Sequence, residues 1–140
     1  KEEIIMRIWN YTPHAINIID DCAFDTMARK YMYKGGEGKY IIKHAVPSDG
    51  VLNAKIKVTP EPKRTVDGVP VYLKEVTGID EIPENVDEDD IVIVSALYAS
   101  CYFKIFGRDN RLHTISDPVY VECADGNFKV VGCRGICEAF

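Results

Sequence analysis

Two arginines lie three residues apart in the polar segment Gly107-Arg108-Asp109-Asn110-Arg111. A guanidinium group presents a planar fork of donors that suits a phosphate or a carboxylate. Asn110 places an amide between the two bases. The spacing predicts an anion-binding loop, although two bases in a loop are also common as surface charges or as partners for nearby acids.

Ser95 follows the apolar run 91–94 and precedes the apolar segment 96–106. Serine is a favoured N-cap, and the free backbone N–H groups in the first turn of a helix attract anions. We therefore expect Ser95 either to bind a phosphate oxygen together with Arg108 and Arg111, or to act as a plain N-cap.

Aromatic rings recur at every fourth position of the expected helix, at Tyr98, Tyr102 and Phe106. Such a stripe can offer rings for an adenine to stack on, but more often it belongs to the core. Arg134 stands among small and apolar neighbours. Its surroundings fit a ligand contact as well as a structural ion pair.

Catalytic signatures that depend on a fixed spacing are absent from the sequence. The three histidines are His14, His44 and His113, and each stands alone. A nucleophile pair such as Cys101 with His113 has no specific support. We expect no catalytic residue, and we place Asn10 and His14, which flank a proline-containing turn, next in line as ligand contacts.

Five cysteines are an odd number for a chain of 140 residues, which favours reduced thiols over a disulfide framework. The trio Cys123, Cys133 and Cys137 is the best alternative as a metal site. Zinc sites, however, usually pair closely spaced cysteines twice over. We expect no metal and no cofactor.

The charge balance is 17 basic residues against 22 acidic ones, and seven of the acids lie in residues 80–90, which hold no base. An acidic chain of this kind does not fit duplex nucleic acid as the main partner, because that affinity depends on many lysine and arginine contacts to phosphate. No apolar run approaches the length of a membrane span, and the opening Lys1-Glu2-Glu3 is not typical of a signal peptide. We expect a cytoplasmic protein without a membrane partner.

Hydrophobic patterning predicts an α+β protein that forms a single domain over residues 1–140. Most of it is expected to be antiparallel β-sheet, with one long apolar helix at about 95–106. Residues 23–33 are expected as a short helix, although Met27, Tyr31 and Tyr33 also suit a strand. Asp67-Gly68 and Asp125-Gly126 each separate apolar runs and predict β-hairpins. The expected strands cover residues 4–9, 15–19, 40–46, 52–58, 69–76, 91–94, 119–123 and 128–132.

Two of these elements carry further expectations. The segment 52–58 alternates apolar and polar residues and is the clearest amphipathic strand, while residues 80–90 form a solvated loop. A helix that is apolar nearly all round must be covered all round, and in a small domain a second copy can supply the cover. We therefore expect a homo-oligomer, a dimer or higher, formed through the helix.

Several short segments resemble a group of small phage and prophage proteins, the Thoeris anti-defence sponge family of the first type. They are Ile8-Trp9-Asn10-Tyr11-Thr12-Pro13-His14-Ala15-Ile16-Asn17-Ile18, Gly68-Val69-Pro70-Val71-Tyr72, Ile93-Val94-Ser95-Ala96-Leu97, Asp117-Pro118-Val119 and Val131-Gly132-Cys133-Arg134-Gly135.

The resemblance implies a protein that captures a cyclic ADP-ribose isomer in the cytoplasm of an infected bacterial host without cleaving it. It also implies an oligomer with nucleotide pockets at subunit contacts, and some members are linked to cyclic oligonucleotides. The alternatives are a viral enzyme that degrades such a signal and a structural phage protein.

Overall fold

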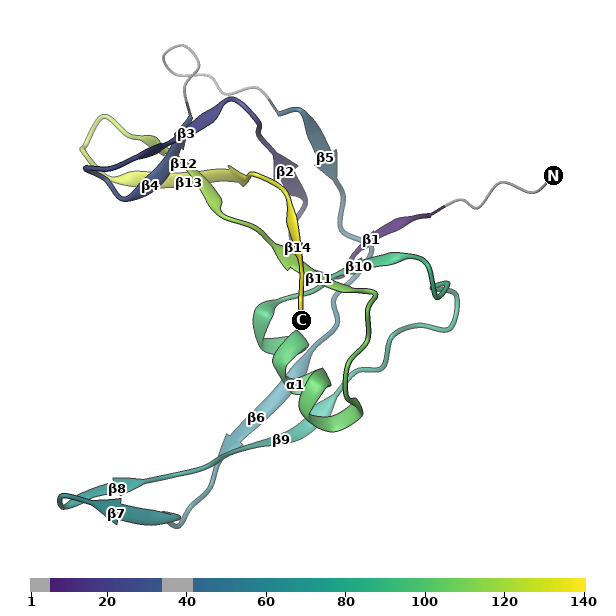
Figure 1. The fold of residues 1–140 in the computed structure, drawn as a ribbon, viewed down its shortest axis with the longest axis vertical. Helices are drawn as coiled ribbons and strands as arrows, with labels where there is room; N and C mark the ends of the chain where they lie inside the picture. The colour runs from purple at the N-terminus through teal and green to yellow at the C-terminus, as the bar shows by residue number, and fades with distance from the viewer. Residues whose placement is uncertain (1–5, 34–41) are drawn as a thin grey trace.

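The computed structural model describes residues 6–33 and 42–140, and within them strands predominate around a single helix (Figure 1). The mainly β, α+β class is therefore confirmed. The helix, α1, spans Ala96–Phe106. In chain order the strands are β1 (Ile8–Asn10), β2 (Ile16–Ile18), β3 (Cys22–Asp25), β4 (Lys30–Tyr33), β5 (His44–Val46), β6 (Ala54–Val58), β7 (Arg64–Val66), β8 (Val69–Val71), β9 (Lys74–Ile79), β10 (Ile91–Ile93), β11 (Leu112–Ile115), β12 (Pro118–Glu122), β13 (Phe128–Cys133) and β14 (Ile136–Glu138).

A four-stranded sheet in the order β1-β10-β11-β14 carries the helix. Strands β1, β10 and β11 are parallel, and α1 is the crossover that joins β10 to β11. Val92, Val94 and Leu112 from this sheet pack with Tyr98 and Ala99 from the helix in one buried cluster. The turn from β10 into α1 therefore lies at the carboxyl end of a parallel strand, where open α/β units commonly bind ligands.

A six-stranded sheet in the order β3-β4-β12-β13-β2-β5 lies beside the first one. Ile16, Val46 and Cys133 from this sheet pack against Ile93 of β10, so a shared buried cluster ties the two sheets together. Across the described residues, six of the ten strand pairings are antiparallel and four are parallel. The sheets are thus mixed, with antiparallel pairs in the majority.

The helix expected near 23–33 is wrong, because this segment is a hairpin of β3 and β4. The Asp25 carboxylate accepts hydrogen bonds from the N–H groups of Met27 and Ala28, at 2.9 and 3.1 Å, which closes the turn. The rings of Phe24 and Tyr31 then meet across the hairpin. Pairing of β4 with β12 provides tertiary contacts that outweigh the helical propensity of the sequence.

The helix begins after Ser95 and ends at Gly107 as expected, but it is not long and it is not covered on all sides. It has 11 residues, about the mean length for globular proteins. Only Tyr98, Ala99 and Cys101 are buried. Its outer side leaves Leu97, Phe103, Ile105 and Phe106 exposed to solvent.

Both expected hairpins form, with different turns. Asp67 and Gly68 have φ angles of 49° and 79° between β7 and β8, as a two-residue turn requires. Between β12 and β13 the connection is longer, and of its Asp-Gly pair only Gly126 has a positive φ, at 85°. The strand expected over 69–76 divides into β8 and the start of β9.

The acidic residues 80–90 form a loop as expected, but one of the acids is buried. Asp90 accepts hydrogen bonds from Trp9 Nε1 at 2.9 Å and from the N–H groups of Arg7 and Asp87, each at 3.0 Å. These donors hold the pKa of the Asp90 carboxyl below its ordinary value. The first residues of the strands expected over 4–9 and 40–46 lie outside the described part of the chain.

Candidate functional site

The turn from β10 into α1 has free backbone donors. Ser95 is the N-cap: its hydroxyl accepts from the N–H of Tyr98 at 3.1 Å, and its carbonyl accepts from Ala99. Within the described chain, the N–H groups of Ala96 and Leu97 have no hydrogen-bond partner, as expected for the first turn of a helix. The Ser95 hydroxyl can still donate its own proton. Three donors therefore converge on an anion placed at this turn.

A groove of about 700 Å³ opens at this turn. This volume is typical of sites for small organic ligands. Its walls come from the β1–β2 loop, the start of α1, β11 and β13, and they are mostly apolar. The lining residues are Thr12, Pro13, His14, Ala15, Ile16, Asn17, Val94, Ser95, Ala96, Thr114, Ile115, Val130, Val131, Gly132 and Cys133.

A second hollow of about 580 Å³ continues the groove along α1. The two hollows share Ala96 and Thr114 and therefore adjoin each other, and we call the two together the trough. The second hollow is also lined by Phe103 and Phe140, and Arg108 closes its far end. Neither Thr114 nor the two phenylalanines stood out in the sequence, because nothing in their local pattern marks them.

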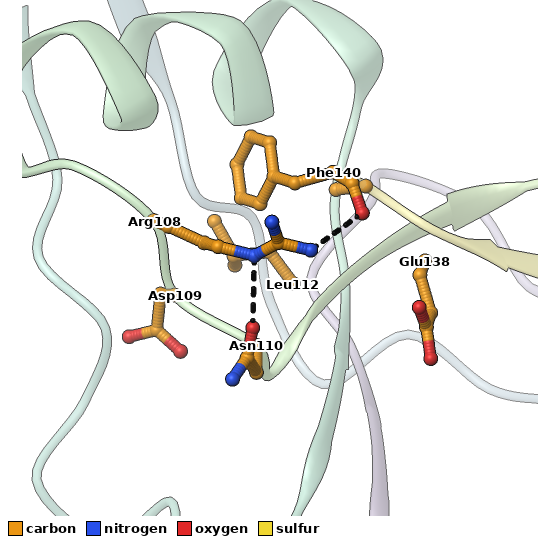
Figure 2. A pocket seen from close by; sticks show the side chains of 7 residues that line it. Arg108, Asp109, Asn110, Leu112, Glu138 and Phe140 are labelled. Atoms are coloured by element: carbon orange, nitrogen blue, oxygen red, sulfur yellow. Dashed lines mark hydrogen bonds between the residues drawn. The ribbon is translucent and has the colours of Figure 1, made fainter.

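Arg108 is held at the far end of the trough, beside a small pocket of about 50 Å³ (Figure 2). Its Nε donates to Asn110 Oδ1 at 3.1 Å, and one terminal nitrogen donates to the carbonyl of Phe140 at 2.9 Å. Its other terminal nitrogen, Nη1, has no partner among the described residues. Asn110 thus orients Arg108 and leaves one charged donor open.

Arg111 uses all three of its nitrogens within the chain. Nε and Nη2 donate to the two carboxylate oxygens of Asp109, at 3.1 and 2.8 Å, and Nη1 donates to the carbonyl of Val86 at 3.2 Å. The pair lowers the pKa of Asp109 and raises that of Arg111, chiefly through these hydrogen bonds. Arg111 therefore fastens the acidic loop to the body rather than facing the groove.

The aromatic stripe on α1 runs from a buried ring at Tyr98 through a partly buried one at Tyr102 to the exposed ring of Phe106. Tyr98 is only 1% exposed, and its hydroxyl donates to the carbonyl of Asp80 at 2.5 Å. Burial raises the pKa of the Tyr98 phenol. Tyr102 lies between Tyr98 and Phe106, and its hydroxyl is 3.4 Å from an Asp109 carboxylate oxygen. A ligand ring has no access to Tyr98.

Asn10 is fully buried and shapes the wall of the groove. Its amide donates to the carbonyls of His14 and Val46, at 2.9 and 3.1 Å. Its side-chain oxygen accepts from the N–H and the hydroxyl of Thr12, at 3.0 and 2.6 Å. Asn10 thus positions the turn, whereas the exposed His14 side chain lines the groove itself.

Arg134 lines neither of the two hollows. Its Nη1 is 3.2 Å from Asp117, and its guanidinium carbon is 4.4 Å from the centre of the Tyr31 ring. This ion pair is one of the two roles expected for Arg134.

Ser95 and Arg108 lie at opposite ends of α1, and the 11-residue helix between them spans about 16 Å. The structure does not bring Ser95, Arg108 and Arg111 to one point within a single copy.

The thiols and imidazoles of the described residues form no group of three that could hold a metal ion with Asp or Glu. All five cysteines are free. Cys133 is buried and its thiol faces the carbonyl of Gly135 at 3.3 Å, and burial raises the pKa of this thiol. His113 Nδ1 lies 2.8 Å from the carbonyl of Arg111.

No helix in the described part of the chain is long and apolar enough to cross a membrane.

No protein-family model, curated protein or solved structure matches this chain.

Proposed function

We propose that this chain is a binding protein that captures a small cyclic nucleotide in the trough beside α1 and releases it unchanged. The observation that supports this most directly is the start of α1, where Ser95 and Ala96, with the Ser95 hydroxyl and the free N–H of Ala96, line a groove of about 700 Å³. A pyrophosphate fits such a cluster of donors, because each N–H gives a hydrogen bond to a charged oxygen.

The rest of the groove suits the organic part of such a ligand. Ile115 and Val130 supply an apolar wall, while the imidazole of His14 and the hydroxyl of Thr114 offer polar contacts. Arg108 at the far end holds a second charged donor for a longer or doubly anionic ligand. Small-molecule sites commonly combine a mostly apolar lining with a few polar groups of this kind.

The resemblance to Thoeris sponges of the first type narrows the proposed ligand to a glycocyclic ADP-ribose isomer, with cyclic oligonucleotides as further candidates. In this proposal the protein is phage-encoded, acts in the cytoplasm of the infected host and works as a homo-oligomer. Sequestration needs no catalytic base, so the proposal assigns none.

The first test replaces Ala96 with proline. Proline at the first helical position removes one N–H and is well tolerated there, and Ser95 already has the φ of −67° and ψ of 154° that a residue before proline adopts. Loss of one charge-assisted hydrogen bond, about 1.5 to 3 kcal/mol, should weaken binding by about 10- to 150-fold. Calorimetric titration with a cyclic ADP-ribose isomer measures this change.

The matched control is Ala96→Val, which adds similar bulk but keeps the N–H. It should retain most of the affinity, and melting curves of both variants should resemble the wild type. Equal affinities for Ala96→Pro and wild type would place the anion elsewhere. Absence of binding by the wild type would remove this ligand. Ligand recovered as product after denaturation of the complex would indicate an enzyme.

Arg108→Ala and Arg111→Ala separate the two arginines. Arg108→Ala should weaken binding while the melting temperature stays near that of the wild type, because this side chain is exposed. Arg111→Ala should lower the melting temperature and leave affinity almost unchanged, because its nitrogens are bonded within the chain. The opposite pattern would mean that the anion binds at Arg111.

A further inference from the structure

The arm, which we define as residues 54–79, extends away from the body (Figure 1), and only its base, at Ala54 and Ile79, packs against the core. It consists of β6 paired with β9 and, beyond the bond from Thr59 N–H to the Leu73 carbonyl, β7 paired with β8. Between Leu52 and Val86 the chain has no buried residue. A hairpin with so little burial has few contacts of its own to hold it in place.

Strand β6 of the arm nevertheless alternates apolar and polar residues, as strands with one buried face do. Along one face of β6 the cover diminishes toward the tip, from Ala54, which is half-buried, to Val58, which is 52% exposed. At the tip, Val66 and Val69 form a directly opposed pair and are 49% and 61% exposed. Valines opposed across a hairpin stabilise it most when another surface covers them.

Beside the base of the arm lies a depression that an apolar side chain can fill. It has a volume of about 160 Å³ and lies between the arm and the outer side of α1. Ile56, Val76 and Leu97 supply its apolar walls. The 52% exposed Leu97 is part of the uncovered face of the helix.

The charges of the arm complement the loop that follows it. The arm holds five basic residues, Lys55, Lys57, Lys63, Arg64 and Lys74, against three acidic ones, Glu61, Asp67 and Glu75. None of these five bases makes an ion pair with a described residue. Residues 80–90 hold seven acids and no base, and none of these acids has an ion-pair partner in the described chain either.

The order of the arm and the acidic loop in the chain allows the arm of one copy to contact the acidic loop of a second copy. Asp80, the first residue of the acidic loop, follows directly after Ile79, the last residue of the arm. When two arms cross antiparallel about a two-fold axis, the tip of each lies over the base of the other. Lys63 and Arg64, which lie near the tip together with Glu61 and Asp67, then meet the acidic loop of the second copy, and the valine pair meets the depression beside α1.

We propose that two copies of this chain dock through their arms about a two-fold axis. Val66 and Val69 of each copy cover the depression at the base of the second arm, and Lys63 and Arg64 pair with the acidic loop. The interface is one self-complementary patch used twice. It does not depend on the ligand proposed above.

Charge reversal tests this pairing with the full chain. The arm variant is Lys63→Glu with Arg64→Glu. The loop variant reverses Glu84, Asp87, Glu88 and Asp89 to lysine, which leaves the loop with four bases against three acids; all six side chains belong to exposed residues. Each variant alone should weaken self-association about tenfold or more, because attraction becomes repulsion at two symmetric places. An equimolar mixture of the two should associate again, since each reversed patch then faces its complement.

Sedimentation velocity at micromolar concentrations measures the mass. The wild type is expected at twice the monomer mass of 15.8 kDa or at a larger even multiple. Lys129→Glu, a charge reversal at an exposed residue of β13 outside the arm, is the control for the arm variant and should keep the wild-type mass. A monomeric wild type, an unaffected mass in both reversed variants, or a mixture that stays dissociated would each overturn the proposal.

Discussion

The body around α1 and the arm have similar apolar patterns, but only the body is covered within one copy of the chain. In the body, Val92 and Leu112 lie buried against the helix. In the arm, Ile56 and Val58 alternate with the lysines of β6 and remain 36% and 52% exposed. Alternation of apolar and polar residues therefore predicts that one face of a strand is buried, but only the tertiary structure shows whether the same copy of the chain buries it.

The largest expected difference between the two regions comes from adding one methyl group to a glycine in each. A Cβ at Gly132 of β13 would clash with the Asn17 carbonyl and the Ile19 side chain, whereas one at Gly78 of β9 would meet only Lys55 at ordinary contact distance, 3.8 Å. Gly132→Ala should lower the free energy of unfolding by about 3 kcal/mol. Gly78→Ala should change it by less than about 0.5 kcal/mol.

Urea unfolding of both glycine variants measures the difference. Equal midpoints for the two variants would contradict the close approach of β13 to β2. A large loss for Gly78→Ala would show instead that the arm is packed more tightly than its exposure indicates.

A smaller difference is expected for the loss of one hydroxyl group. Tyr98→Phe removes the buried hydrogen bond to the Asp80 carbonyl and should lower the free energy of unfolding by about 1 kcal/mol. Tyr72→Phe makes the same change in the arm, at a ring that is 47% exposed, and should leave stability unchanged. Melting curves measure both variants. Equal shifts in melting temperature would mean that the Tyr98 hydroxyl stabilises the body no more than the Tyr72 hydroxyl stabilises the arm.

The smallest expected effect is a change in the pH dependence of stability. Hydrogen bonds, first from Trp9 and then from the N–H groups of Arg7 and Asp87, hold the pKa of Asp90 below its ordinary value of 3.8. A carboxyl with a lowered pKa stabilises the fold above that ordinary value, and the contribution is lost as the pH falls through the folded pKa. The stability advantage of wild type over Asp90→Asn should therefore narrow from about pH 4 downward.

Trp9→Phe removes the leading donor to Asp90 and should shift stability in the same direction with pH as Asp90→Asn does. Thermal melting from about pH 3 to pH 7 follows both variants. Parallel curves for wild type and variants over this range would show that Asp90 titrates alike in the folded and unfolded chain.

Much of the fold could be predicted from the sequence where local signals agree with the tertiary structure. Ser95 and Gly107 bound the helix, and the two Asp-Gly turns form hairpins, because caps and turns depend on neighbouring residues. The β3–β4 hairpin could not be predicted, since its pairing with β12 depends on a segment far along the chain.

The candidate site could be predicted only in part, for a similar reason. Residue type marks Ser95 and Arg108 as anion contacts, and both line the trough. The same residue type marks Arg111 equally well, yet the neighbouring Asp109 occupies two of its nitrogens. Spacing in the sequence does not reveal which charged groups are already satisfied within the chain.

The parallel pairing of β1 with β10 also has a consequence for the order of folding. Ile8 pairs with Ile91, and β10 pairs in turn with β11, so the central sheet cannot close until most of the chain has been synthesised. The arm hairpin depends only on near neighbours and can form earlier. During translation we therefore expect the segment of the arm to leave the ribosome, with its apolar side chains uncovered, before the body exists. That interval is the one in which chaperone binding or premature association of nascent chains would act.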